Sequence, residues 1–229
     1  MLFVAVMCYV ILMLFKYLSK KKEEKPETGG IKNIIFDVGQ VLVDYDWETY
    51  LDSFGFEPVK RERIAKATFQ SPVWDERDRG LYEEDVYLKQ FQELDPEDAE
   101  DIEKVIRGTG GTIHKRPYAD TWVKYLKSKG YHLYILSNYA SYMIDHTKKE
   151  LTFRKEMDGE VFSCYVNQLK PEPEIYQTIL DKYQLKPEES VFIDDRPENC
   201  QGAQEQGIHT ICFKDFKQVT ADLEKLGVK

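Results

Sequence analysis

The chain has 229 residues, of which 42% are hydrophobic and 32% charged, and its formal net charge is −9 at pH 7. This length suits one good-sized core with an insertion better than two independent domains. The acidic balance argues against a nucleic-acid partner, because contact with a phosphate backbone needs a basic surface. The four cysteines show no paired metal-ligand spacing, which indicates free thiols in a reducing compartment.

The first thirty residues differ in character from the rest. Residues 2–15 are all apolar, and counting on to Leu18, with Lys16 snorkelling, reaches the lower limit of about seventeen residues for a bilayer span. No positive charge precedes the run and no small-residue cleavage site follows it, which disfavours a cleaved signal peptide. The basic residues 20–22 favour a cytoplasmic body. We expect residues 1–30 to form an apolar, membrane-anchoring helix and a linker; an amphipathic lead helix is the alternative.

A buried strand is predicted for the apolar run at residues 34–36, which ends at Asp37. A turn, Val38-Gly39-Gln40, separates it from a second apolar run at residues 41–43. In an open α/β sheet, ligands bind beyond the carboxyl ends of the strands, where Asp37 would lie. Taken alone, Asp37 could equally cap a turn.

Residues 44–112 form a block with helical spacing. Helices are predicted for residues 47–56, 59–69, 81–94 and 96–106, with breaks at Pro58, Pro72, Gly80 and Pro96. The glycine-rich residues 108–111 are interpreted as a hinge. The block is therefore a helical insertion directly after the first strand.

An alternation of strands and helices resumes after the insertion. Helices are predicted for residues 118–129, 141–150, 173–183, 198–206 and 221–226, and strands for residues 131–136, 161–166, 191–193 and 208–213. This alternation indicates an α/β fold with a parallel sheet and right-handed crossovers.

Polar residues follow three of the predicted strands, and a lysine fixed by a following proline lies between the second and the third. In chain order they are Asp37, Ser137-Asn138, Lys170 and Asp194-Asp195. An aspartate is already ionised at pH 7 and can attack a phosphoryl group if a cation offsets the repulsion between them. Carboxylates suit Mg²⁺, which prefers oxygen ligands. Each feature alone has an ordinary explanation as a helix cap, a surface lysine or a turn, but the set in this order favours phosphoryl transfer.

The four segments resemble the motifs of the haloacid dehalogenase (HAD) superfamily of aspartyl-nucleophile hydrolases. They are residues 36–42 (FDVGQVL), 136–138 (LSN), 169–176 (LKPEPEIY) and 192–199 (FIDDRPEN). The resemblance implies a Rossmann-like catalytic core at residues 31–43 and 113–229, with an inserted helical cap at residues 44–112.

The resemblance also implies a role for each matching residue. Asp37 would be the nucleophile, assisted by Lys170, and the phosphate would be bound by Ser137, Asn138 and Lys170. The Mg²⁺ cofactor would be held by Asp195 as principal ligand, with Asp37, Asp194 and the carbonyl of Gly39.

Residue 39 departs from the pattern of most family phosphatases, which place a second aspartate there to protonate the leaving group. Gly39 has no side chain, and general acid–base catalysis is worth about 10²–10⁴-fold. Sugar-phosphate phosphatases of the glucose-1-phosphatase type, which this stretch resembles most, also carry glycine. Asp44 or Asp46 could replace the missing acid; otherwise the substrate has a good leaving group or the enzyme is slow.

The leading hypothesis is a Mg²⁺-dependent phosphatase that hydrolyses a small phosphorylated metabolite, such as a sugar phosphate, through an aspartyl-phosphate intermediate. Trp74, Arg77 and Arg79 in the cap are candidate substrate contacts, although Trp74 also suits a cap core. The alternatives are a metal-independent 2-haloacid dehalogenase and a catalytically inactive, membrane-tethered interaction module.

Overall fold

The computed structural model describes residues 30–229, and residues 31–229 form one compact unit. The predicted N-terminal anchor and most of its linker lie outside the described residues. Within the part that is described, no helix combines the length and the apolar character that crossing a bilayer requires.

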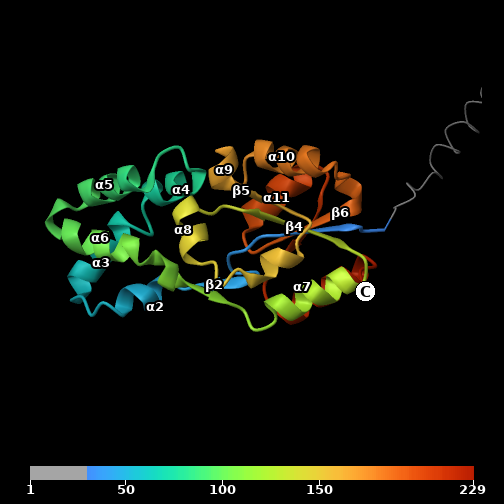
Figure 1. The fold of residues 1–229 in the computed structure, drawn as a ribbon, viewed down its shortest axis with the longest axis horizontal. Helices are drawn as coiled ribbons and strands as arrows, with labels where there is room; N and C mark the ends of the chain where they lie inside the picture. The colour runs from blue at the N-terminus through green and yellow to red at the C-terminus, as the bar shows by residue number, and fades with distance from the viewer. Residues whose placement is uncertain (1–29) are drawn as a thin grey trace, which may run out of the picture. The chain divides into compact units, whose positions relative to one another are not determined.

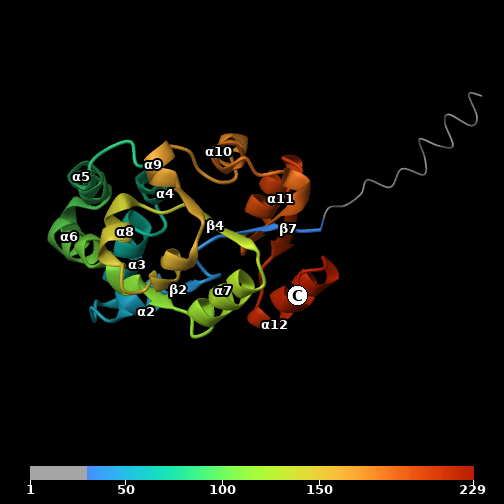
Figure 2. The same ribbon diagram turned by 45° about the vertical axis from the view of Figure 1, so that its right-hand side comes forward.

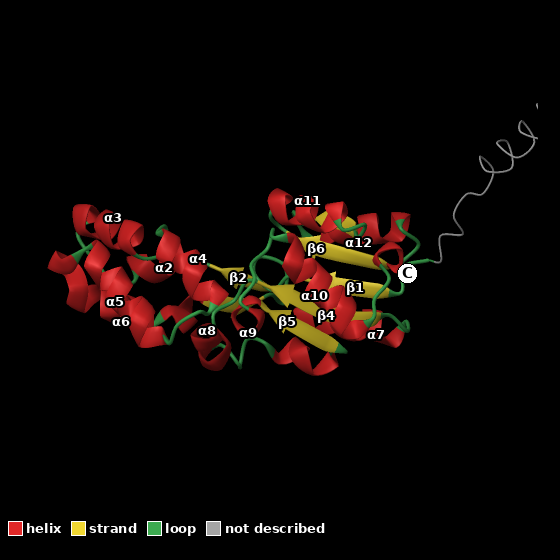
Figure 3. Cartoon of the chain, turned by 90° about the horizontal axis from the view of Figure 1, so that it is seen from above, coloured by secondary structure: helices red, strands yellow, loops and turns green. Residues whose placement is uncertain are grey.

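A five-stranded parallel sheet forms the centre of the unit (Figure 3). In spatial order its strands are β5 (Gly159–Phe162), β4 (His132–Ser137), β1 (Asn33–Phe36), β6 (Ser190–Asp194) and β7 (His209–Cys212). Every neighbouring pair is parallel, which confirms the α/β fold predicted from the alternation of strands and helices.

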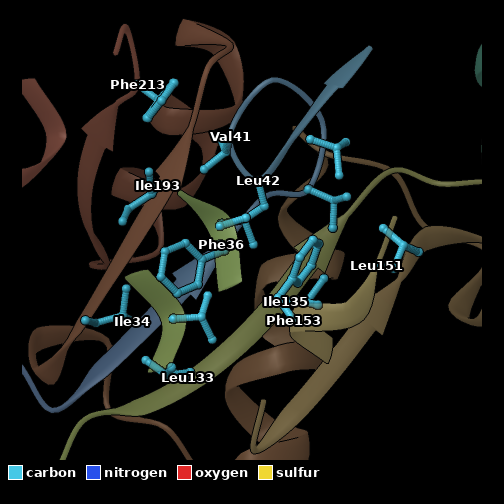
Figure 4. Packing of buried hydrophobic residues seen from close by; sticks show 14 of the residues in the cluster. Ile34, Phe36, Val41, Leu42, Leu133, Ile135, Leu151, Phe153, Ile193 and Phe213 are labelled. Carbon is cyan, nitrogen blue, oxygen red and sulfur yellow. The ribbon is translucent and has the colours of Figure 1, made fainter. Parts of the chain in front are cut away.

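Helices cover both faces of this sheet (Figures 1 and 2). One face packs against α7 (Ala119–Ser128) and α12 (Phe216–Lys225), and the other against α10 (Pro173–Tyr183) and α11 (Pro197–Glu205). Side chains of a strand alternate between faces, so Ile34 and Phe36 join the first layer whereas Ile35 joins the second. The fully buried Phe36 lies among apolar side chains that include Ile135 of β4 and Ile193 of β6 (Figure 4).

The insertion leaves and re-enters the core through a second, two-stranded antiparallel sheet. Its strands are β2 (Val43–Tyr45) and β3 (Ile113–Lys115). Between them lie α2 (Trp47–Asp52), α3 (Pro58–Ala67), α4 (Pro72–Arg79), α5 (Glu84–Leu94) and α6 (Ala99–Arg107). These helices share their own hydrophobic cluster, which includes Leu51, Ile64, Phe91 and Ile106. Figure 3 shows them beyond the end of the central sheet at which its strands finish.

Short helices account for most differences from the sequence prediction. Residues 72–79 form α4, although the sequence analysis placed breaks at Pro72 and Gly80 and no helix between them. Pro72 occupies the first turn of α4, and Gly80 ends the helix in the left-handed conformation. The strand predicted at residues 161–166 ends at Phe162 and continues as α9 (Ser163–Val166).

Several predicted boundaries also move. The first cap helix ends at Asp52, α8 spans Ser141–His146, and α12 begins at Phe216. The glycine-rich hinge is a 3₁₀ turn, η2 (Thr109–Thr112), packed against Tyr50. The remaining short turns are η1 (Pro96–Asp98), η3 (Thr152–Glu156) and η4 (Pro187–Glu189).

The cap cluster predicts a clear contrast within α5. Phe91 is fully buried, whereas Leu94 is 52% exposed. We expect Phe91→Ala to lower the free energy of unfolding by about 3–5 kcal/mol, because it leaves a cavity in the cap. Leu94→Ala on the same helix should change it by less than about 0.5 kcal/mol. Urea denaturation checks both, and equal effects would contradict a packed cap core.

Candidate active site

The strand register brings the first two candidate residues together. Phe36 of β1 pairs with Ile193 of β6, so Asp37 and Asp194, the next residues of the two strands, lie side by side. The amide of Asp37 donates to the carbonyl of Ile193 at 2.9 Å. Ser137 ends β4 on the other side of β1, and its side chain is buried.

Lys170 lies between the two carboxylates. Its Nζ is 2.9 Å from Oδ1 of Asp37 and 2.6 Å from Oδ2 of Asp194, and its side chain is only 1% exposed. Within the described residues, Oδ1 of Asp37 accepts no hydrogen bond of good geometry. Its contact with Nζ of Lys170 is therefore an ion pair. A buried ammonium is retained at such a position only when carboxylates balance its charge.

The backbone of Lys170 is fixed by its surroundings. The amide side chain of Asn138 accepts from the Lys170 N–H at 2.8 Å and donates to the Lys170 carbonyl at 3.0 Å. Gly202 of α11 packs against Pro171, the residue after Lys170. A Cβ added at Gly202 would lie 2.8 Å from the carbonyl oxygen of Pro171. Asn138, expected to bind substrate, therefore holds the lysine loop in place, and its side chain also lines the cavity.

A cluster of three carboxylates could hold a metal ion. Oxygen atoms of Asp37, Asp194 and Asp195 lie within 4.8 Å of one another. With one ammonium beside them, the formal charge is −3 + 1 = −2, which a divalent cation balances. Asp194 is already engaged by Lys170, the Arg196 amide and Asn199, whereas Asp195 is half-buried and lines the cavity. This donor set fits Mg²⁺, with Asp37 and Asp195 as the freer ligands.

Burial and charge shift the titration of these groups. Burial raises the pKa of Asp37 to about 6; Lys170 and the Ser137 hydroxyl oppose the rise, and Asp194 adds to it. Burial alone would lower the pKa of Lys170, but Asp194 and Asp37 together raise it. The pKa of Asp195 is raised by burial and then by Asp194. Asp37 and Asp195 are therefore harder to ionise here than in water, and a bound cation would favour their charged forms.

The turn after Asp37 leaves room beside the nucleophile candidate. Gln40 has φ of 55° and forms hydrogen bonds with the Tyr45 carbonyl and with Arg116. Gly39 lines the cavity, and a Cβ added there would meet only Oδ2 of Asp37, at 4.0 Å. A Cβ would therefore fit at residue 39, although the sequence places none there.

The two acids expected to replace the aspartate that is missing at residue 39 lie outside the cavity. Asp44 is on β2 and forms an ion pair with Arg116 at 2.9 Å, and Asp46 caps α2 by accepting from the Thr49 amide. Neither lines the cavity that contains Asp37. The expectation that one of them folds back is wrong for this structure, because pairing of the two short strands and the helix cap engage both carboxylates.

A cavity of about 310 Å³ joins the strand ends to the cap. The core contributes the polar residues at its floor, and the cap contributes apolar side chains and two acids. The cap and its connecting strands supply Tyr45, Phe69, Trp74, Asp75, Asp78 and Ile113. Trp74 lies 4.9 Å from Phe69 and 6.0 Å from Tyr45 between ring centroids, so the three rings form one wall.

Only one of the three cap residues expected to contact substrate lines this cavity. Trp74 does, while also packing against the cap core. Arg77 is 1% exposed and donates to Glu84 through Nη2 and Nε, at 2.6 and 3.0 Å. Arg79 binds Glu172 of the core at 2.7 and 2.9 Å. For the two arginines the expectation is wrong. Arg77 pairs with a carboxylate on the next helix, and Arg79 pairs with one that is distant in the sequence.

Sequence reasoning missed Asp78, Arg196 and most of the ring wall. Arg196 follows the acidic pair, lines the cavity and pairs with Glu198 at 2.7 Å. Asp78 lies on a helix that the sequence analysis did not predict. An acidic residue in the middle of a charged cap carries no local pattern that separates it from a solvated one.

The excess negative charge predicts a cost in stability. In the metal-free protein the folded state holds the Asp37 proton more tightly than the unfolded state, so stability falls as pH rises from about 4 to about 6. Asp37→Asn should therefore raise the free energy of unfolding at pH 7 with EDTA, by roughly 1–3 kcal/mol. Denaturation with EDTA and with Mg²⁺ measures this, and Mg²⁺ should stabilise the wild type more than the variant.

The exposed Asp181→Asn provides the control and should change stability little in either condition. A metal-free Asp37→Asn protein that unfolds more easily than the wild type would contradict the charge balance described above.

Comparison with known proteins places this chain in a family. Residues 31–207 match the model of the family described as haloacid dehalogenase-like hydrolase. A 107-residue stretch is 34% identical to bifunctional epoxide hydrolase 2 of Rattus norvegicus, covering 44% of this chain but only 19% of that protein. The chain is also 25% identical over 211 residues to flavin mononucleotide hydrolase 1 of Arabidopsis thaliana, covering 92% of this chain and 83% of the relative.

Solved structures share the fold. A HAD family enzyme of Bacteroides thetaiotaomicron, solved in complex with magnesium and inorganic phosphate, superposes with a TM-score of 0.65. The alignment covers 83% of this chain and 99% of that one at 23% identity. The family match spans β1 to β6 of the core sheet, the insertion and the carboxylate site. The chain therefore belongs to the haloacid dehalogenase-like hydrolases.

Proposed function

We propose that this hydrolase is a Mg²⁺-dependent phosphatase acting on a small phosphorylated metabolite through a phosphorylated Asp37. The observation that carries the proposal is the ion pair of Asp37 with the buried Lys170, beside three clustered carboxylates at the floor of a cavity. A nucleophilic carboxylate, a fixed cation and a metal-sized group of oxygens are what transfer of a phosphoryl group to a carboxylate needs.

Each core residue has a task in this reaction. The ionised Asp37 attacks phosphorus, and Lys170 stays charged and reduces the repulsion between the nucleophile and the phosphate. We assign Ser137 at the end of β4 to a phosphate oxygen, because its hydroxyl lies beside the Asp37 carboxylate, although Ser137 itself does not line the cavity. Asp37, Asp195, Asp194 and the Gly39 carbonyl are the ligands that we assign to Mg²⁺, which supplies charge neutralisation when bound.

The insertion at residues 44–112 acts as a cap that selects the substrate. The polar floor suits the phosphate, so the ring wall of Tyr45, Phe69 and Trp74 faces the rest of the substrate. A cavity of this size takes a small leaving group with a flat or apolar surface. Sugar phosphates are the first class to test. The relative named for flavin mononucleotide hydrolysis and the neighbour solved with magnesium and phosphate support a phosphate-ester substrate.

The test is hydrolysis of p-nitrophenyl phosphate and a panel of sugar phosphates, with Mg²⁺ or with EDTA. We expect activity only with Mg²⁺ and a loss of about 10³-fold or more in Asp37→Asn, because no other group forms the intermediate. Asp44→Asn is the matched control. It should keep its activity within about threefold, since Asp44 forms only a partly exposed ion pair outside the cavity.

Two outcomes would contradict the proposal. Halide release from 2-chloropropionate without Mg²⁺, in the absence of phosphatase activity, would favour the dehalogenase. No activity on any ester, together with no stabilisation by Mg²⁺ and BeF₃⁻, would favour an inactive interaction module.

We further propose that residues 2–18, apolar except for Lys16, anchor the protein in a membrane, with the catalytic body on the cytoplasmic side. The support is the length of the apolar run and the basic residues after it. Full-length protein should remain with the membrane fraction after an alkaline carbonate wash. Leu12→Arg should release part of it, because a charge at the centre of a span is costly. A wild-type protein recovered entirely in the soluble fraction would contradict the anchor.

A further inference from the structure

The proposed reaction lacks a proton donor at the position where most phosphatases of this family carry one, since residue 39 is glycine. Both acids expected from the sequence lie outside the cavity. Of the four aspartates that line it, Asp37 and Asp195 have roles already and Asp75 is exposed. The fourth is Asp78, on helix α4 of the cap.

Asp78 is tied to the loop that follows β4. The backbone N–H of Ala140 in that loop lies on the side of the Asp78 carboxyl group and acts to lower its pKa. The Ser163 hydroxyl donates to the main-chain carbonyl of Asp78 at 2.5 Å and accepts from the Tyr139 amide at 2.8 Å. The main chain of Asp78 is thus bonded to the catalytic core, although the residue belongs to the cap.

The end of α4 is clamped to the core at three further points. Arg79 makes its two-pronged ion pair with Glu172, and Asn167 donates to the carbonyls of Arg79 and Gly80 at 3.1 and 3.0 Å. Gly80 lies so close to Cys164 that a Cβ there would be 2.7 Å from its Cα. These contacts fix the position of Asp78 relative to the floor of the cavity.

The surroundings of Asp78 suit a group that exchanges a proton. Within residues 30–229 it has no ion-pair partner, because the flanking arginines bind Glu84 and Glu172. Burial raises the pKa of Asp78 to about 7; Arg77 opposes the rise, and Asp75 and Asp37 add to it. A general acid works best when its pKa is near the working pH.

The other titratable groups that face Asp78 stay uncharged near neutral pH. They lie on β2, on the loop after β4 and on α9. Burial raises the pKa of each, and they are Tyr45, Tyr139 and Cys164. The charged neighbours that remain are Asp75 and Arg77 on the same helix and Asp37 at the cavity floor.

We propose that Asp78 is the general acid and base of this enzyme, supplied by the cap in place of a residue at position 39. This inference rests on the proposed phosphatase function. As Asp37 attacks phosphorus, the bond from phosphorus to the leaving oxygen breaks, and that oxygen takes the electron pair and the Asp78 proton, giving an alcohol. The Asp78 carboxylate then accepts a proton from water. The water oxygen attacks phosphorus, and the bond to Asp37 breaks, returning its carboxylate and releasing phosphate.

Two aryl phosphates of similar shape test this role. Phenol has a pKa of about 10, like tyrosine, and leaves poorly without a proton, whereas p-nitrophenol is far more acidic. In Asp78→Asn, kcat/KM should fall about 10²–10⁴-fold for phenyl phosphate and less than tenfold for p-nitrophenyl phosphate. kcat should fall for both, because the base for the second step is lost. A burst of p-nitrophenol equal to the enzyme concentration should therefore appear.

Three matched variants sharpen the test. Glu76→Gln removes one charge from the exposed side of the same helix and should leave both substrates unaffected. Gly39→Asp in the Asp78→Asn protein should restore part of the phenyl phosphate activity, since a Cβ at residue 39 meets only Oδ2 of Asp37, at 4.0 Å. Asp37→Asn should abolish turnover and burst alike. In the wild type, kcat/KM for phenyl phosphate should decline above about pH 7, and Asp78→Asn should remove this decline.

The possible failures are distinguishable. Equal effects of Asp78→Asn on kcat/KM for the two esters, or no effect on either, would overturn the role of Asp78 while leaving the phosphatase intact. The p-nitrophenyl ester serves as the folding control within the same variant. A wild type that hydrolyses neither ester, or an Asp37→Asn protein that hydrolyses both, would overturn the proposed function and the role of Asp78 with it.

Discussion

The buried ammonium of Lys170, held between two carboxylates, is the interaction on which the site depends. Asp37 and Asp194 are side by side because parallel strands end at the same level, and two ionised acids so close together would repel each other. Lys170 offsets that repulsion but leaves the cluster, Asp195 included, with net negative charge. In our proposal, catalysis and metal binding thus have one origin, which is the net negative charge of the carboxylate cluster at the edge of the sheet.

The rest of the core can be understood as support for this ion pair. The amide side chain of Asn138 holds the backbone of Lys170 from the end of the neighbouring strand. The small Gly202 allows α11 to approach the following Pro171, and Asn199 on the same helix orients Asp194. Burial of the Lys170 ammonium and of the Asn199 amide nitrogen is acceptable because both donate to Asp194.

Residues fixed by the strand ends were the ones that could be predicted from the sequence. Parallel pairing carries Asp37, Asp194 and Ser137 to one edge whatever the details of the loops, so motif order was enough to expect their convergence. The ion-pair partners of Asp44 and Arg79 were not predictable in this way. They depend on single partners, Arg116 and Glu172, that are 72 and 93 positions away in the chain, and no local pattern specifies such pairs.

The cap shows the same limit at the level of secondary structure. Helix α4 is too short for a clear apolar period, and its proline and glycine looked like breaks rather than a first turn and a cap. Because that helix was missed, Asp78 was missed as well. In our account the two parts of the protein have different roles. The sheet edge and the Lys170 loop supply the nucleophile and the ammonium group, and the cap supplies the wall for the leaving group and the proton.

The central claim is that Asp37 carries the phosphoryl group during turnover. Acid quenching of the protein with p-nitrophenyl phosphate and Mg²⁺, followed by peptide mass spectrometry, tests it most directly. Our account predicts one added phosphoryl group on the peptide that contains Asp37, in greater amount in Asp78→Asn than in the wild type. Product formation without any modified Asp37, or a phosphoryl group on another residue, would contradict it.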